Sequence, residues 1–389
     1  MKIICGTDFT PNAQDATRVA AALARRLGDS LDLVHAVAKP PVKGLDAEVW
    51  RGYLEPLREE LEEKARPHRE QGLTVRTQLK VGSAADALVA AAARRNVRLL
   101  VLASIGRVAV SRLLVGSVAE RAAEASTAPT LVVRRPAPLL GWAEGRAPLK
   151  VFVTADFSPA SDAALRWVRH WREAGPCEVT VAYLDWPPEE GRRLGMLSPL
   201  PLEGNPPGIQ NALERDLRER AVAQLGTEEV RVVVASSWGR PAVRAVELAT
   251  EAGADVMVAG THQARGLKRL WQGSFSRTLL HDSPTNVVLV PSPADAPSAS
   301  AVPSFHRVLV ATDFSALGNQ AIPTAVGAVE PGGTLRLVHV LASPGAAAGR
   351  TAADQLRRLV PPEAAARGVV VEVEVLAEPA AAAAIQQAA

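Results

Sequence analysis

A short segment recurs three times along the chain, and this recurrence constrains the fold more than any other feature. The segments "IICGTDFTPNAQDA", "VFVTADFSPASDA" and "VLVATDFSALGNQA" begin at Ile3, Val151 and Val308. Each is an apolar, β-branched run followed by Asp-Phe-Ser/Thr and an alanine-rich stretch with a helical pattern. Self-similarity of this kind indicates repeated structural units. Each unit is predicted to begin with a buried parallel strand that leads into a helix.

The first two copies continue alike through four further apolar runs. These are "SLDLVHAV", "LTVRTQLKVG", "VRLLVLAS" and "APTLVVRR" in the first copy, and "EVTVAYLDW", "EVRVVVASSWG", "ADVMVAGT" and "TNVVLVPS" in the second. Helical patterns separate most of them, and such alternation predicts an α/β fold of tandem open doubly wound parallel five-stranded sheets. We assign copy one to residues 1–137 and copy two to 148–293. The connecting segments 135–149 and 291–304 are rich in proline and small residues and are predicted to be linkers.

The third copy, residues 305–389, repeats the first strand, the helix and the second strand "TLRLVHVLASP". One further apolar run, "GVVVEVEVLAEP", follows, and after it comes the alanine-rich stretch "AAAAAIQQAA". Counterparts of the fourth and fifth strands are not found in this segment. We therefore expect an incomplete sheet whose first strand, "RVLVAT", has an unpaired edge.

Composition removes several classes of protein. Apolar residues make up 48% and charged residues 22% of the chain, which is typical of globular domains. The net charge of +3 is too small and too scattered to indicate a nucleic-acid partner. Two cysteines exclude a disulfide framework and favour a reducing compartment. We find no apolar run of about 18 residues and no secretory leader, so the sequence predicts a soluble cytoplasmic protein without a membrane partner.

A glycine segment follows the fourth strand in both complete copies. It reads "ASIGRVAVSRLLVGSVAER" from Ala103 and "GTHQARGLKRLWQGSFSR" from Gly260. Open α/β sheets bind their ligands at the carboxyl ends of strands, which is where both segments lie. Gly116–Ser117 and Gly273–Ser274 stand where a helix is predicted to begin. A glycine allows close approach of an anion, and the free N–H groups of a helix start bind phosphate.

The aspartate after the first strand and the glycine spacing together resemble the universal stress protein family. Its ATP-binding members carry Gly, two residues, Gly, nine residues, Gly, and then Ser or Thr. The spacing is kept in both copies, and each copy has lost one glycine. The matching positions are Ala103, Gly106, Gly116 and Ser117 in copy one, and Gly260, Gln263, Gly273 and Ser274 in copy two.

This resemblance implies an adenine nucleotide alpha hydrolase-like fold that binds ATP, with or without Mg²⁺. Asp8 would also be the candidate contact for the metal. Copy one should be the better site, because Gln263 needs more room than glycine and disfavours a positive φ. The nucleotide-binding residues that the resemblance implies are Thr7, Asp8, Val37, Ala103, Gly106, Arg107, Gly116, Ser117, Val118, Asp156, Gly260, Gly273 and Ser274.

The function that follows is an ATP-binding stress-response or regulatory protein. The alternative is an interaction scaffold of the same fold whose sites have decayed. No catalytic motif is found, and slow ATP hydrolysis is the third reading. Family members dimerise along the last strand, so we expect copies one and two to pair within the chain through "TLVVRR" and "NVVLVP", with a homo-oligomer as a further expectation. The third copy should bind no nucleotide.

Purely structural explanations compete with these assignments. Asp8 and Asp156 are also suited to capping the helix that follows them. Gly116–Ser117 would serve equally as an ordinary helix start. His262 has no second ligand at metal-binding spacing, which favours a loop role.

Overall fold

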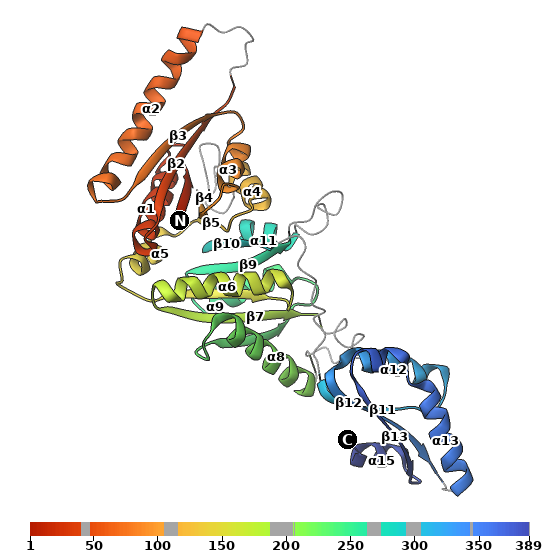
Figure 1. Cartoon of the computed structure of the whole chain (residues 1–389). Coiled ribbons are helices and arrows are strands. Elements are labelled where there is room, and N and C mark those ends of the chain that lie inside the picture. The colour runs from red at the N-terminus through yellow and green to blue at the C-terminus, as the bar shows by residue number, and fades with distance from the viewer. Residues whose placement is uncertain are drawn as a thin grey trace. The chain divides into compact units, whose positions relative to one another are not determined.

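The computed structural model describes residues 1–39, 47–104, 116–186, 205, 207–262, 274–292, 305–342 and 345–388. Figure 1 shows the elements along the chain. The strands are β1 Lys2–Gly6, β2 Ser30–Val37, β3 Val75–Val81, β4 Val97–Ala103, β5 Thr130–Val133, β6 Leu149–Ala155, β7 Cys177–Asp185, β8 Arg231–Ser236, β9 Val256–His262, β10 Asn286–Ser292, β11 Phe305–Ala311, β12 Val329–Leu341 and β13 Val370–Ala377. The helices are α1 Pro11–Leu27, α2 Ala47–Glu70, α3 Ala84–Ala92, α4 Ser117–Ala125, α5 Pro136–Ala143, α6 Pro159–Ala174, α8 Pro207–Leu225, α9 Pro241–Glu251, α11 Ser274–Asp282, α12 Ala316–Ala328, α13 Ala346–Leu359, α14 Pro362–Ala366 and α15 Ala381–Ala388.

Copies one and two share a single ten-stranded sheet within one compact unit. Copy one contributes the order β3-β2-β1-β4-β5, in which all neighbouring strands are parallel. Successive side chains of a strand point to opposite faces, so the apolar runs bury both sides. Ile4 belongs to the core formed with α3 and α4, whereas the Cys5 sulfur lies 3.7 Å from the Thr17 hydroxyl of α1. The sheet is therefore covered by helices on both faces, as the sequence predicted.

Copy two repeats this order as β8-β7-β6-β9-β10. Helix α6 packs against β6, β9 and β10, while α9 packs against β7 and α11. Arg220 of α8 binds both carboxylate oxygens of Asp162 on α6, at 2.7 and 2.8 Å. In copy one β1 lies beside β4, and the next strands, β2 and β5, lie on opposite sides of this pair. In copy two β6 lies beside β9, with β7 and β10 on opposite sides. This junction is the topological switch point at which doubly wound sheets bind ligands.

The two copies meet where β5 and β10 pair in antiparallel orientation. Leu131 lies opposite Val288, between the pairs Thr130–Leu289 and Val132–Val287. The pairing joins two edge strands and so removes both exposed edges from the middle of the sheet. The predicted intrachain pairing through the last strands is confirmed.

The segment between the copies contains a helix, whereas the sequence predicted only a linker. Pro136 stands at the first helical position of α5, where the missing N–H is not needed. Leu139 and Trp142 of this helix are fully buried, and the Trp142 ring stacks on Trp171 of α6 at 5.0 Å. Helix α5 also packs against α1. Tertiary burial of these apolar side chains outweighs the turn-like composition of the segment.

The third copy forms a separate parallel sheet of three strands in the order β11-β12-β13. Helices α12 and α13 pack on it, around a core that includes Ile322, Leu335 and Leu356. Strand β11 corresponds to β1 and forms one edge of the sheet in the described residues, as predicted. Among the helices described here, none is long and apolar enough to cross a membrane.

Candidate functional site

The turn after β1 is built around Asp8. Thr10 is the N-cap of α1, because its hydroxyl accepts a hydrogen bond from the Ala13 amide at 3.3 Å. The Asp8 Oδ1 atom accepts from the Thr10 amide at 3.1 Å and from the Thr10 hydroxyl at 2.6 Å. Asp8 therefore orients the capping residue rather than capping the helix itself, and its carboxylate stays at the carboxyl end of β1.

The same turn occurs in the other copies. Asp156 Oδ1 accepts from the Ser158 amide at 3.0 Å, and Asp313 Oδ1 accepts from the Ser315 amide at 2.9 Å. Hydrogen bonds from Ser315 lower the pKa of Asp313 below its ordinary value. The turn is thus a common structural element of all three copies, and by itself it does not distinguish a binding site.

A left-handed phenylalanine follows the aspartate in every copy. Phe9, Phe157 and Phe314 have φ values of 66°, 59° and 65°, a region that bulky residues rarely occupy. Each ring contacts an aromatic side chain of the next strand, and in copy one the Phe9 and His35 ring centroids are 4.3 Å apart. The His35 Nδ1 atom also lies 2.7 Å from the Thr7 carbonyl oxygen. Sequence analysis missed this contact, although the repeated phenylalanine was the signal that could have revealed it.

The second predicted contact, Val37, ends β2 and is buried, with 7% of its surface exposed. Its carbonyl oxygen accepts a hydrogen bond from the Gly82 amide at 2.7 Å. A ligand base would therefore have to use the second lone pair of this oxygen or a neighbouring backbone group.

In copy one, Ser104 and Gly116 flank the part of the glycine segment that lies outside the described residues, and these two residues are hydrogen-bonded neighbours. The Gly116 amide donates to the Ser104 carbonyl oxygen at 2.7 Å, which holds the start of α4 against the end of β4. Gly116 is the N-cap, with φ −66° and ψ 143°, and as a glycine it supplies no side-chain cap to the helix. Ser117 and Val118 are exposed on the first turn. The first N–H groups of α4 therefore have no side-chain acceptor from the capping position.

The structure brings the predicted site residues Thr7, Asp8 and Ala103 of copy one together at the carboxyl ends of the strands. Strands β1 and β4 are parallel neighbours, with Cys5 opposite Val101, so Thr7 and Asp8 emerge beside Ala103. Gly106 and Arg107 lie outside the described residues, as does most of the glycine segment. Their predicted roles remain predictions.

Copy two differs at the position of Ala103. A Cβ atom on Gly260 would lie 2.1 Å from the Ala160 carbonyl oxygen and 2.8 Å from the Ser161 amide nitrogen. The first turn of α6 thus passes directly over Gly260, and packing alone requires glycine there. Gln263 and Gly273 lie outside the described residues, and Ser274 is described only as the first residue of α11.

Metal binding finds no support from a ready-made ligand cluster. Among the described residues no three His, Cys, Asp or Glu side chains are grouped to hold an ion. Asp8, the predicted metal contact, would supply one ligand alone, so a cation here would have to be held by further oxygens such as nucleotide phosphates.

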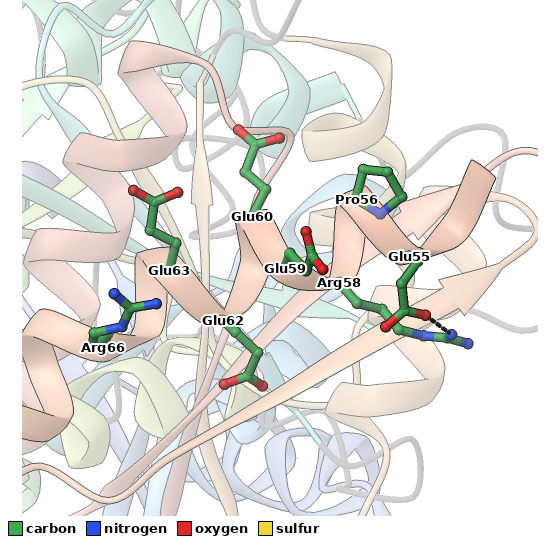
Figure 2. Close-up of a pocket in the computed structure, with 8 residues that line it drawn as sticks. All are labelled: Glu55, Pro56, Arg58, Glu59, Glu60, Glu62, Glu63 and Arg66. Atoms are coloured by element: carbon green, nitrogen blue, oxygen red, sulfur yellow. Dashed lines mark hydrogen bonds and ion pairs between the residues drawn. The ribbon is translucent and has the colours of Figure 1, made fainter. Parts of the chain in front are cut away.

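A surface hollow lies elsewhere, along α2. Figure 2 shows its lining side chains projecting from this one helix, with an ion pair of 3.0 Å between Arg58 and Glu55. None of the lining residues is a predicted site residue; they are Glu55, Pro56, Arg58, Glu59, Glu60, Glu62, Glu63 and Arg66. An exposed acidic helix face of this kind repels phosphate and is not a candidate nucleotide site.

Comparison with known proteins agrees with the fold and the two complete copies. The model of the universal stress protein family matches residues 1–134 and 149–291, and the chain therefore belongs to this family. A universal stress protein of Methanocaldococcus jannaschii is 30% identical over 140 residues, which cover 35% of this chain and 82% of that protein.

One solved structure supports the fold, and a second is similar over part of the chain. A universal stress protein from Archaeoglobus fulgidus superimposes with a TM-score of 0.55 at 18% identity, covering 75% of this chain and 98% of its own. A universal stress protein in complex with cAMP is 25% identical, with a TM-score of 0.29, and covers 34% of this chain and 96% of its own.

Proposed function

We propose that the protein is a nucleotide-binding regulator of the stress response, and that ATP binds in copy one at the carboxyl ends of β1 and β4. The observation that carries this proposal is the start of α4, where Gly116 leaves the first N–H groups without a side-chain cap. Unpaired helix N–H groups attract anions through both hydrogen bonding and the helix dipole. Their position at the topological switch point suits a nucleotide.

Phosphate groups would be bound by the backbone of Gly116, Ser117 and Val118 and by the Ser117 hydroxyl. Ser117 and Val118 are exposed, so a ligand can reach them. In this proposal Gly106 and Arg107 complete the phosphate site, and Ala103 forms its floor at the end of β4.

The other end of the ligand would lie along the ends of β1 and β2. Thr7 and Asp8 would contact the ribose, and the backbone near Val37 would contact adenine. Asp8 is held by its bonds from Thr10, so its carboxylate is preoriented. When Mg²⁺ accompanies ATP, Asp8 and phosphate oxygens would bind it together.

Copy two provides a second, weaker site at Asp156, Gly260, Gly273 and Ser274. Its glycine at 260 is explained by contact with α6, so only Gly273 and Ser274 remain as evidence for phosphate binding there. This supports the ranking of copy one above copy two.

Calorimetric titration of the full chain with ATP, with and without Mg²⁺, tests the proposal. We expect one tighter site, and Gly116→Val should weaken it at least tenfold by closing the approach to the backbone. Gly52→Val is the matched control, because Gly52 lies on α2 with nothing near its Cβ position. ADP and cAMP should be titrated in parallel.

Two outcomes would contradict the proposal. Absence of binding by all three nucleotides at millimolar concentration would favour the interaction scaffold of the same fold. Equal affinity of the wild-type and Gly116→Val chains would place any binding elsewhere. Steady release of phosphate from ATP would add hydrolysis to the proposed function.

A further inference from the structure

The contact between copies one and two has the geometry of a two-fold dimer made from unlike halves. Aligning Gly116 with Gly273 makes Leu131 the counterpart of Val288. These two counterparts lie opposite each other in the β5–β10 pair. In such an isologous contact, a residue on the axis faces its own counterpart, and every other contact occurs twice with the two copies exchanged. Where the two copies differ in sequence, the interface shows which combination of copies it fits.

The first difference is a pair of opposite charges. Glu120 of α4 and Arg277 of α11 are counterparts, and the Arg277 Nε atom lies 2.6 Å from Glu120 Oε1. His281 Nε2 approaches the other carboxylate oxygen at 3.4 Å. Only 14% of the Glu120 side chain is exposed. Two copies of type one would bring two mostly buried glutamates together, and two copies of type two would oppose two arginines.

The second difference concerns backbone donors. Asn286 is fully buried, and its Oδ1 atom accepts from the amides of Arg134 and Arg135, each at 3.0 Å. Its Nδ2 atom donates to the Arg135 carbonyl oxygen at 2.9 Å and to the Asp255 carbonyl oxygen at 2.8 Å. The side-chain amide of Asn286 thus makes four hydrogen bonds, three of them across the interface.

The counterparts of Asn286 and Arg134 are prolines. Pro129 replaces Asn286 in copy one, and Pro291 replaces Arg134 in copy two. Proline has no N–H to donate, so a partner facing Pro291 needs no acceptor for that position. Pairing two type-one copies would leave the Arg134 and Arg135 amides opposite Pro129, without an acceptor. Pairing two type-two copies would leave Asn286 opposite Pro291, without one of its donors.

We infer that the β5–β10 interface is a specificity surface that accepts only copy one against copy two and rejects contact between like copies. Its determinants are Glu120 with Arg277, and Asn286 with the Arg134–Arg135 backbone. The partner it fits is therefore already present in the same chain. A universal stress protein domain carrying a symmetric interface would match neither half, so this surface excludes mixed dimers with such domains.

Crosslinking of the full chain tests which copies meet. With a short bismaleimide, the double variant Glu120→Cys/Arg277→Cys should give an internal crosslink at monomer mass. Neither single variant should give a crosslinked dimer, although a contact between like copies would place two identical cysteines together. The native thiols should react little with maleimide at pH 7, because burial raises the pKa of Cys5 to about 12 and of Cys177 to about 11. The wild-type chain treated with the same reagent is the control for their reaction.

The rejection of contact between like copies is tested by giving copy two the interface residues of copy one. Arg277→Glu/Asn286→Pro should lower the midpoint of thermal unfolding by at least about 5 °C and cause concentration-dependent association. The charge exchange Glu120→Arg/Arg277→Glu should stay within about 2 °C of wild type, although each single change lowers the midpoint. Arg95→Glu, at an exposed position between α3 and β4, is the control for charge alone.

Three results would overturn the inference. These are a crosslinked dimer from either single-cysteine variant, a wild-type midpoint for Arg277→Glu/Asn286→Pro, and failure of the charge exchange to recover the loss caused by its single components. The recovery experiment does not depend on the more disruptive proline variant remaining folded.

Discussion

Copies one and two have the same strand order, yet they use the end of the fourth strand differently. In copy one this position is Ala103, and the nearby helix α4 begins at an uncapped glycine. In copy two it is Gly260, over which the first turn of α6 passes so closely that a Cβ has no room. A glycine in a ligand-binding motif can therefore be required by packing. Counting motif glycines is an unreliable way to rank two such sites.

The largest expected effect comes from filling the space at Gly260. Gly260→Ala places a methyl group 2.1 Å from the Ala160 carbonyl oxygen, so α6 must move. We expect unfolding in denaturant to show a loss of about 3 kcal/mol. The reciprocal change Ala103→Gly should cost less than about 1 kcal/mol, mainly through chain entropy. Similar losses from both variants would remove the distinction between the copies.

The second prediction separates helix stability from ligand binding. Gly116 has an extended backbone that accepts any residue, so Gly116→Asp should cap α4 and raise stability by a few tenths of a kcal/mol. The same carboxylate would occupy the proposed phosphate position and lower ATP affinity at least tenfold, measured by calorimetry. Gly273→Asp in copy two should leave the tighter site unchanged. A more stable variant that still binds ATP would exclude α4 as the phosphate site.

A third comparison uses the strand-end aspartates. Asp8→Ala and Asp156→Ala each remove the acceptor for a turn amide, so each should lose about 1 kcal/mol of unfolding free energy. Asp8→Ala is expected to weaken the tighter ATP site as well, whereas Asp156→Ala should leave that tighter site unchanged. Asp8→Asn keeps the turn acceptor and is the control that isolates the charge. Equal losses at the tighter site from Asp8→Ala and Asp156→Ala would contradict the ranking of copy one above copy two.

The smallest effect concerns the two thiols, one in each copy. Burial raises the pKa of Cys5 to about 12 and that of Cys177 to about 11, against an ordinary value of 9.0. A raised folded-state pKa means that the stabilisation is complete below pH 9 and is lost as pH rises towards these values. In a thiol-reagent titration, half-buried Cys177 should react first. Cys5 should react only as the chain unfolds, and early reaction of Cys5 would contradict its burial against α1.

Much of this architecture could be predicted from sequence, because apolar runs and their spacing determine strands and helices locally. The three copies, the parallel strand order and the pairing of the last strands followed from such patterns and from the family resemblance. The close approach of α6 to Gly260 could not be predicted, since it depends on helix placement within an ångström. Helix α5 was missed because Pro136 and its neighbours resemble a turn, and only burial of Trp142 makes the helix favourable.

The left-handed phenylalanine turn has a consequence for how the chain folds. Phe9 reaches only as far as His35, and Phe314 only as far as His339, so each contact closes a short strand–helix–strand loop. Contacts of low sequence separation form early, because little loop entropy opposes them. We expect this unit to be the folding nucleus of each copy, with later strands adding to it. The three-stranded sheet of the third copy contains this unit, and mutating Phe314 should slow its refolding more than it speeds its unfolding.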